Sequence, residues 1–393
     1  MHGECGTVDC THTTHENVLW TAIRTEAELR AIKGGTATQY YYLTNDIKLN
    51  GTSWNPTGRI ALCLNGYSII ANGNFDTIIV NDGTNSAASL TLCDCNGSGN
   101  NKGEITHADG TTGRGVYVTT SGWFYQYGGN ITGNSTSDNG GGVYLDGSFF
   151  YMYGGRITDN SANNGGGVAG CVKDKVDGRR VIGSLLMLGG TIADNKATAN
   201  GGGVAMDCSF EMRGGSITNN EAGANGGGVA VIAAYTAQWS GGSVTGNTAQ
   251  NSGGGVYVDS GAKAMAVGGD VNITRNINGN VYLPGGKKIT VGGALNDSAS
   301  IGVTSEAVPD DSTPVTIATA ADNWINDNNF TADNSFYKVT VLDGKTATLG
   351  LHEHQWKVRV KTGSENILEE YCDVAGCTVA DGTLTLEAPN QTY

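Results

Sequence analysis

The sequence predicts an all-β protein, a right-handed parallel β-helix with three strands in each coil of about 25 residues. The first observation behind this prediction is a repeated "GGGV" motif, whose valine keeps a step of 25 to 27 residues with one exception of 36. The aligned valines are Val116, Val143, Val168, Val204, Val229, Val256 and Val281. The second observation is that apolar and polar residues alternate in the short segments between the motifs, which show no helical period. A fixed period of this kind is typical of β-solenoids.

Composition and charge narrow the alternatives. The chain has 393 residues with 62 glycines and 5 prolines, which is too glycine-rich for helices. The glycines cluster instead of recurring at every third position, so collagen is excluded, and regular apolar positions argue against disorder. The net charge of -14 leaves no basic surface for phosphates, so we expect no nucleic-acid partner.

Each coil divides into three short strands, for example "GVYLDGS", "FFYMYGG" and "RITDNSA". Each strand is expected to pair with its copy one coil along, about 4.8 Å away. The glycines then occupy the corner before the first strand, where a positive φ or close backbone stacking excludes a Cβ atom. A second corner carries an asparagine whose amide is expected to bond along the axis, at Asn134, Asn160, Asn195, Asn220 and Asn247.

Alternation along the strands assigns side chains to the core or to the surface. Residues such as Val143, Leu145, Phe150 and Met152 are expected to point inward. On the outside, an aromatic cluster beside polar groups and a basic insertion at 171–183 suits a glycan or peptide laid across coils. The predicted ligand-binding residues are Tyr125, Tyr127, Tyr144, Tyr151, Tyr153, Glu211, Arg213, Lys173 and Arg179. A solvated insertion loop and a tyrosine ladder that only supports packing are the alternatives.

The ends of the chain differ from its middle. "TEAELRAI" predicts a short helix at 25–32, capped by Thr25, that covers the first coil. "SFYKVTVLDGKTATLGL" predicts a hairpin that turns at Asp343 and Gly344. The expected domains are a Cys/His segment at 1–20, a capping helix at 21–39, the β-helix at 40–305, a hairpin cap at 306–351 and a small Cys/His β module at 352–393.

Two clusters hold most of the cysteines and histidines. The candidate metal ligands are Cys5, Cys10, His12 and His15 at one end and His352, His354, Cys372 and Cys377 at the other. Each set could hold a structural zinc ion, or its two cysteines could form a disulfide bond, and both interpretations stay open. No cofactor is otherwise required. Cys63, Cys93 and Cys95 lie on apolar strands and are expected to be small buried hydrophobic residues.

Several segments together carry a family resemblance. They are "WTAIRTEAELRAI", "YYYLTNDIKL", "LCLNGYSI", "LTLCDC", the repeated "GGxITxNxA…GGGV" and the terminal "HEHQW…YCDVAGC…LTLEAP". Together they resemble large secreted or wall-anchored β-helix proteins of anaerobic, gut-type Gram-positive bacteria. The repeats are also similar to those of chlamydial polymorphic outer-membrane proteins, which are adhesins. The resemblance implies a β-helix at the cell surface and no particular catalytic residue.

Two functions follow as hypotheses. The first is a secreted or cell-wall-attached module, a rigid monomeric rod within a larger surface protein that binds a glycan or a host surface ligand. Its leader and anchor would lie outside this sequence, which shows no membrane span; a cytoplasmic protein is the other interpretation. The second hypothesis is an inverting glycoside hydrolase or a polysaccharide lyase. Its catalytic residues would be Asp146 and Asp207, two coils apart, with Glu211 on the next strand.

Overall fold

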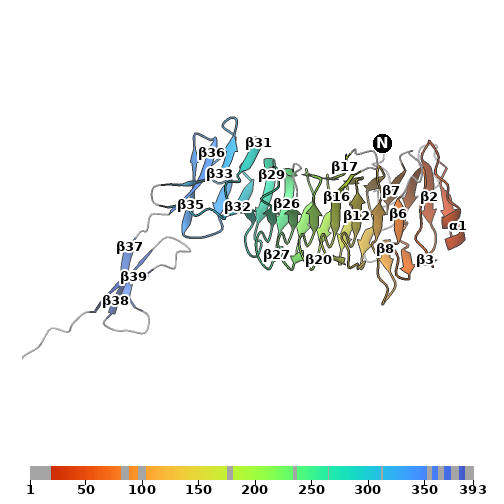
Figure 1. Ribbon diagram of the computed structural model, residues 1–393, viewed down its shortest axis with the longest axis horizontal. Helices are drawn as coiled ribbons and strands as arrows, with labels where there is room; N and C mark the ends of the chain where they lie inside the picture. Colours follow the sequence, from red (N-terminus) through yellow and green to blue (C-terminus); the bar gives the residue numbers. More distant parts are fainter. Residues whose placement is uncertain are drawn as a thin grey trace, which may run out of the picture.

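The computed structural model describes residues 19–80, 88–95, 103–174, 180–232, 237–263, 265–310, 313–351, 356–361, 367–372 and 380–385. The protein is all-β, with 52% of its residues in strands and 2% in helix. A single sheet joins 32 of the described strands. Figure 1 shows these strands stacked side by side along an elongated body. The prediction of an all-β protein dominated by parallel pairing is therefore confirmed.

A first ladder of parallel strands contains the valines of the glycine motif, each paired with its counterpart one repeat away, as Val143 pairs with Val116 and Val168. The ladder consists of β6 (Ile78–Val80), β9 (Val116–Val118), β12 (Val143–Asp146), β16 (Val168–Asp174), β21 (Val204–Met206), β25 (Val229–Val231), β28 (Val256–Val258), β30 (Val281–Leu283), β32 (Ser300–Ser305) and β34 (Phe330–Ala332).

A second ladder follows the strand that comes next in each repeat. It consists of β1 (Thr21–Ile23), β2 (Gln39–Leu43), β4 (Arg59–Cys63), β7 (Ser89–Cys93), β10 (Trp123–Gln126), β13 (Phe149–Met152), β18 (Ser184–Met187), β22 (Ser209–Met212), β26 (Ala237–Thr245), β29 (Met265–Thr274), β31 (Ile289–Leu295) and β33 (Val315–Ala320). Its pairing begins at β1, within the segment that the sequence assigned to the cap.

A third ladder completes each repeat. It consists of β3 (Ile47–Asn50), β5 (Ile69–Asn72), β8 (Glu104–His107), β11 (Asn130–Thr132), β14 (Arg156–Thr158), β19 (Thr191–Ala193) and β23 (Ser216–Thr218), and it continues into β26, β29 and β32. Four two-residue strands form a small separate sheet: β15 (Ser161–Ala162), β20 (Lys196–Ala197), β24 (Glu221–Ala222) and β27 (Thr248–Ala249).

The core lies between the three ladders and is filled by like residues from successive repeats. The predicted inward positions are confirmed, because Val143, Leu145, Phe150 and Met152 are each 0% exposed. Phe124 stacks on Phe150 with 4.8 Å between ring centroids. One contiguous apolar cluster thus runs through the described repeats, so each repeat is stabilised by its neighbours.

A ladder of asparagines, buried from Asn134 to Asn247, follows the third strand of successive repeats. The side-chain Nδ2 of Asn134 donates to Oδ1 of Asn160 at 2.9 Å, and the pattern continues along the body. The members are Asn134, Asn160, Asn195, Asn220, Asn247, Asn276 and Asn280. The ladder begins at a ring nitrogen of His107, 2.8 Å from Asn134, and ends at the carboxylate of Asp333. The predicted amide stacking is confirmed.

The glycine triplet serves two different steric needs. Gly201 has φ of 67°, a left-handed conformation that side chains disfavour. A Cβ atom on Gly202 would lie 2.5 Å from the carbonyl oxygens of Glu221 and Gly227, and one on Gly203 would lie 2.7 Å from that of Gly228. The first glycine is therefore required by backbone conformation, and the other two by the approach of the neighbouring repeats.

The helix α1 (Glu26–Ala31) lies at one end of the body, as Figure 1 shows. The Thr25 side chain accepts a hydrogen bond from the backbone N–H of Glu28 at 3.2 Å, which is the predicted cap. Leu29 is fully buried, and Arg30 donates to backbone oxygens of Thr52 and Ser53. The helix is thus fixed against the adjoining strands.

At the other end, β35 (Tyr337–Leu342) and β36 (Thr346–Leu351) form an antiparallel hairpin, and β36 also pairs with β33. Asp343 and Gly344 have φ of 50° and 63°, so the predicted turn is confirmed. Parallel pairing continues past residue 306 into β33 and β34. β37 (Trp356–Val360), β38 (Ile367–Cys372) and β39 (Ala380–Thr385) form a separate three-stranded antiparallel sheet.

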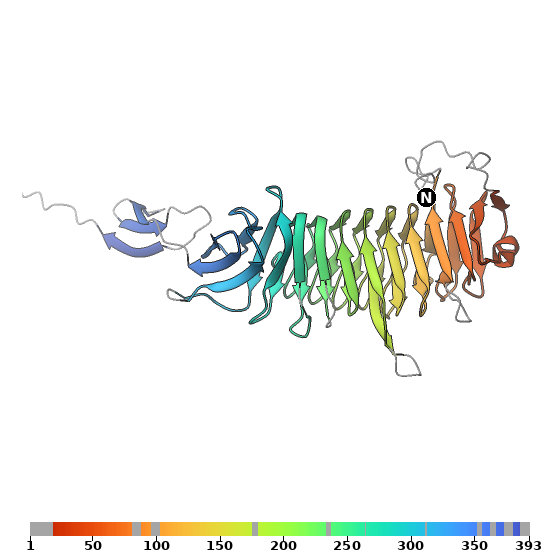
Figure 2. The same cartoon turned by 90° about the horizontal axis from the view of Figure 1, so that it is seen from above.

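The long repeat contains the expected insertion. β16 extends to Asp174 and pairs in an antiparallel manner with β17 (Arg180–Ile182). Figure 2 shows this pair extending beyond the neighbouring strands. The extra residues leave the regular stack as a hairpin, so the parallel register resumes at β18 without a shift.

Candidate functional site

The outward side of the second ladder carries three parallel columns of side chains. The register between β10 and β13 places Trp123 beside Phe149 and Tyr125 beside Tyr151. The next outward positions are Tyr127 and Tyr153, which follow these two strands. Six rings therefore form one block, which we call the aromatic face: Trp123, Tyr125, Tyr127, Phe149, Tyr151 and Tyr153.

The rings of the aromatic face stack in pairs across the two repeats. Trp123 and Phe149 have centroids 4.4 Å apart, and Tyr125 and Tyr151 have centroids 5.3 Å apart with 25° between planes. The rings of Tyr127 and Tyr153 are nearly parallel, with centroids 4.4 Å apart and 3° between planes. Tyr153 is 41% exposed and the other five rings are half-buried. Because the paired rings turn their faces toward each other, the aromatic face presents mainly ring edges and hydroxyl groups to solvent.

Burial raises the pKa of two phenols of this face, Tyr125 and Tyr127. Partial burial raises the pKa of Tyr125, and the neighbouring phenols of Tyr151 and Tyr153 raise it further. Burial, followed by the adjacent Tyr153, raises the pKa of Tyr127 to about 12. The surface therefore offers neutral rings with hydroxyl groups at their edge, which suits an uncharged polyhydroxylated ligand.

Two open depressions flank the aromatic face along the axis of the body. One, of about 440 Å³, is lined by Thr38, Arg59, Ser89, Thr91, Trp123, Tyr125 and Tyr127. The other, of about 340 Å³, is lined by Tyr151, Ser184, Leu185, Leu186, Ser209, Phe210, Glu211 and Gln238. Both are on the second ladder, so small polar residues and shallow hollows continue the face in each direction.

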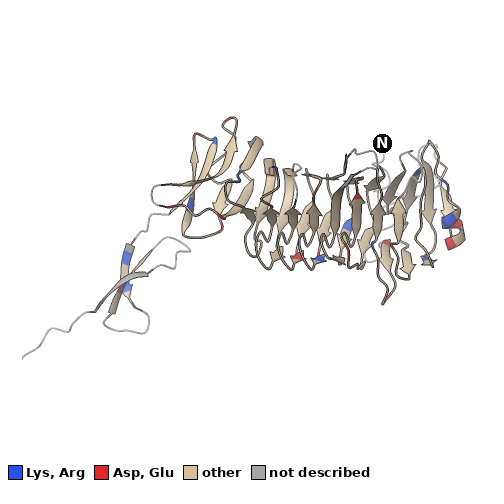
Figure 3. Ribbon diagram, viewed as in Figure 1, with Lys and Arg blue, Asp and Glu red and all other residues tan. Residues whose placement is uncertain are grey.

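Of the charged groups predicted for this site, only Glu211 and Arg213 are placed by the described residues on the second ladder. Glu211 lines the second depression and forms an ion pair with Arg213 at 2.6 Å. Lys173 is in β16, on the first ladder, and Arg179 lies outside the described residues. Figure 3 shows that lysine, arginine, aspartate and glutamate are scattered over the described strands without a continuous basic stretch.

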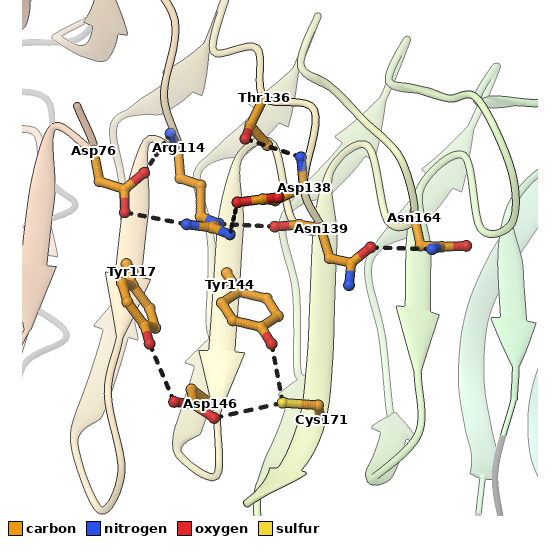
Figure 4. A network of polar contacts seen from close by, with 10 residues as sticks. All are labelled: Asp76, Arg114, Tyr117, Thr136, Asp138, Asn139, Tyr144, Asp146, Asn164 and Cys171. Carbon is orange, nitrogen blue, oxygen red and sulfur yellow. Dashed lines mark hydrogen bonds and ion pairs between the residues drawn. The ribbon is translucent and has the colours of Figure 1, made fainter. Parts of the chain in front are cut away.

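A polar network covers the outward side of the first ladder instead (Figure 4). The guanidinium of Arg114 pairs with Asp76 at 3.3 Å and with Asp138 at 3.1 Å. The same group lies over the rings of Tyr117 and Tyr144, 5.4 and 4.8 Å from their centroids. Tyr144, predicted as a ligand contact, therefore belongs to this network and not to the aromatic face.

Asp146 is on the outward side of β12, as alternation predicts, but it is only 6% exposed. The Tyr117 hydroxyl donates to its Oδ2 at 3.1 Å, and the Cys171 thiol lies 3.6 Å from its Oδ1. The Tyr144 hydroxyl contacts the same thiol at 3.1 Å. Burial, followed by Asp146, raises the pKa of Tyr117 to about 12, and burial is also the largest cause that raises the pKa of Cys171.

This burial changes the interpretation of the candidate carboxylates. Asp146 pairs with Cys171, and Asp207 follows Met206, the partner of Gly170, so the two aspartates keep the expected separation of two repeats. Asp146 is covered by a phenol and a thiol, however, and the described depressions include Glu211 but neither aspartate. Glu211 therefore lines an open depression, whereas Asp146 is buried within the polar network.

Among the described residues, the structure gathers three other cysteines. The sulfur atoms of Cys63, Cys93 and Cys95 all lie within 4.8 Å of one another, and the three residues are buried. The predicted metal ligands at the N-terminus, with His352, His354 and Cys377, lie outside the described residues, and Cys372 ends β38. Cys171 and Cys208 are free thiols.

Sequence reasoning missed two members of the aromatic face. Trp123 and Phe149 each begin a strand of the second ladder, at the outward position two residues before Tyr125 and Tyr151. The same alternation that selected the tyrosines selects these residues as well. Counting outward positions from the first residue of each strand would have found them.

No described helix is both long enough and apolar enough to cross a membrane. In comparisons with known proteins, no family model, no curated protein and no solved structure matches the chain.

Proposed function

We propose that the chain is a right-handed parallel β-helix that acts as a rigid extracellular surface module and binds a neutral glycan along its aromatic face. Three strands per repeat and a repeat of about 25 residues support the β-helix, and a parallel crossover is right-handed in nearly all proteins. The surface location rests on the family resemblance of the repeats.

The observation that carries the binding proposal is the aromatic face itself. Six rings occupy consecutive outward positions of two adjacent repeats, and the depressions on either side are lined by serine, threonine, arginine, glutamate and glutamine. A contiguous apolar patch with a polar border is typical of a binding surface. Together with the two depressions, the aromatic face forms a path from β4 to β26 of about 29 Å at roughly 4.8 Å per repeat, which is long enough for an extended oligosaccharide.

The chemistry of the face favours sugars over charged polymers. The ring carbons that the stacked pairs leave exposed can pack against the C–H groups of a pyranose, and the hydroxyl groups of the ligand can bond to Ser89, Thr91 and Ser184 at the edges. Arg59 and Glu211 stand at opposite ends of the path. We do not extend the proposal to catalysis, because Asp146 is buried in the polar network.

The first test is a glycan array probed with the purified chain, followed by titration calorimetry with the best ligand. The double substitution Tyr125→Ser with Tyr151→Ser removes two stacked rings. Losing about 1 kcal/mol per ring predicts roughly 30-fold weaker binding. A reducing-end assay on the same glycans reports any hydrolysis.

The matched control is a second stacked pair, Tyr257 and Tyr282, which lies on the first ladder with centroids 5.5 Å apart. Tyr257→Ser with Tyr282→Ser should leave the affinity unchanged. If binding instead survives loss of Tyr125 and Tyr151 but is abolished by Lys173→Ala with Arg179→Ala, the insertion is the binding site and the proposal is wrong.

A further inference from the structure

We propose that Cys63, Cys93 and Cys95 bind a thiophilic metal ion, and that zinc is the ion their geometry favours. Cys63 and Cys93 come from neighbouring repeats and are direct partners in the β4–β7 pairing. Their sulfur atoms and that of Cys95 lie within 4.8 Å of one another, and the residues are 0%, 2% and 6% exposed. The proposal does not depend on glycan binding.

The fold positions the three thiols on one side of the second ladder. Leu62 and Leu92 point into the core, so the next residues, Cys63 and Cys93, are outward. Between Cys93 and Cys95 lies Asp94, whose carboxylate accepts hydrogen bonds from the backbone N–H groups of Gly66 at 2.7 Å and Gly103 at 2.8 Å. Cys95 comes two residues after Cys93, and its sulfur lies within 4.8 Å of the other two.

The local geometry is close to that of a metal–thiolate site. A tetrahedral zinc ion with Zn–S bonds of about 2.3 Å needs sulfur atoms about 3.8 Å apart, so the cluster has to contract by at most about 1 Å. The backbone N–H of Cys95 donates to Sγ of Cys63 at 3.3 Å, and a hydrogen bond of this kind favours the thiolate form. Sulfur ligands select zinc over calcium or magnesium.

The cluster is enclosed by aromatic side chains from neighbouring repeats. Trp20, Tyr42 and Tyr127 pack against the three cysteines. Such a shell excludes water and strengthens metal–thiolate attraction. Buried cysteines that act only as small hydrophobic residues need no convergence of their sulfur atoms, so the convergence is the feature that favours a metal.

The test measures metal content of the full chain, purified without chelators under reducing conditions and reconstituted with zinc or cobalt(II). Cys93→Ala and Cys95→Ala should each lose about one equivalent of zinc and the thiolate-to-cobalt absorption band. Cys208→Ala is the matched control, because Cys208 is a buried free thiol elsewhere in the body, and it should keep both. Equal metal content in Cys93→Ala and the parent would overturn the proposal.

A second measurement needs no substitution and so does not depend on how the variants fold. In the parent protein, alkylation followed by peptide mapping should label Cys63, Cys93 and Cys95 faster after chelation, with Cys208 unchanged. Unchanged labelling, or a disulfide bond found within the three, contradicts the proposal.

Discussion

Replacing the buried Asn195 by alanine should destabilise the protein more than replacing the half-buried Asn164. Asn195 is 1% exposed and its side chain makes four hydrogen bonds. Its Oδ1 accepts from the backbone N–H of Asn160 at 3.0 Å and from the Asn160 side chain at 2.9 Å. Its Nδ2 donates to the Ile157 carbonyl at 2.9 Å and to Asn220 at 3.0 Å.

The magnitude follows from what the substitution leaves behind. Asn220 keeps a donor, because the backbone N–H of residue 195 still reaches its Oδ1 at 3.0 Å. The backbone N–H of Asn160 and the carbonyl of Ile157 lose partners in a site that is closed to water. At about 1 kcal/mol for each lost bond, and more for the buried N–H group, Asn195→Ala should cost about 4 kcal/mol.

Urea unfolding gives the total cost, and hydrogen exchange followed by mass spectrometry gives its location. The Asn160 amide should exchange about 10³-fold faster in the variant, since about 4 kcal/mol corresponds to nearly three decades. The control is Asn164→Ala, in a second and half-buried asparagine column where Asn164 donates to Asn139 at 3.0 Å. Water can replace those bonds, so a cost of about 1 kcal/mol is expected. Equal costs at the two positions, with the Asn160 amide still protected, would show that the ladder is not held by its buried amides.

Two further predictions concern backbone packing and pH. Gly202→Ala should lower the free energy of unfolding by about 3 kcal/mol in the same assay, because the added Cβ atom would lie 2.5 Å from two carbonyl oxygens. The control is Gly292→Ala, where a Cβ atom has nothing within 4 Å, and its free energy of unfolding should stay within about 0.5 kcal/mol of the parent. The pKa of Tyr117 is raised to about 12, so the folded state favours the protonated phenol. The stability that this phenol contributes is therefore complete below pH 10, the pKa of an unfolded tyrosine, and is lost as the pH rises through about 12. Unfolding free energies from pH 9 to 12 should therefore fall more steeply in the parent than in Tyr117→Phe, and parallel curves would contradict this.

The repeating part of the fold could be predicted from sequence because each repeat reports on the next. The glycines before Val143 and the asparagine at position 160 recur one repeat away. This recurrence indicates that both positions are corners between the strands of a coil. The structure confirms the inward positions, the asparagine ladder, the Thr25 cap and the Asp343–Gly344 turn. In each of these the signal is local or periodic.

Contacts between side chains at non-equivalent positions of neighbouring repeats could not be predicted in this way. Alternation places Asp146 outward, but its burial comes from Tyr117 in one neighbouring repeat and Cys171 in the other. The convergence of Cys95 with Cys63 depends on the path of the chain after β7 ends at Cys93, where the alternation of a strand no longer applies. Such contacts require the three-dimensional register as well as the direction of each side chain.

The asparagine ladder has a polarity, and this polarity bears on how such a chain can change its length. Every amide donates toward the next repeat, so the row behaves as a one-way chain that needs an acceptor only where it stops. Asp333 fills that place, since it accepts from Asn280 and from Thr304 and has no donor of its own when ionised. A whole repeat inserted between two asparagines would bring its own asparagine, which would accept a hydrogen bond from the repeat before it and donate one to the repeat after it. Duplication or loss of single repeats therefore leaves no amide unsatisfied, and the length of the rod can drift in evolution while its two terminators stay fixed.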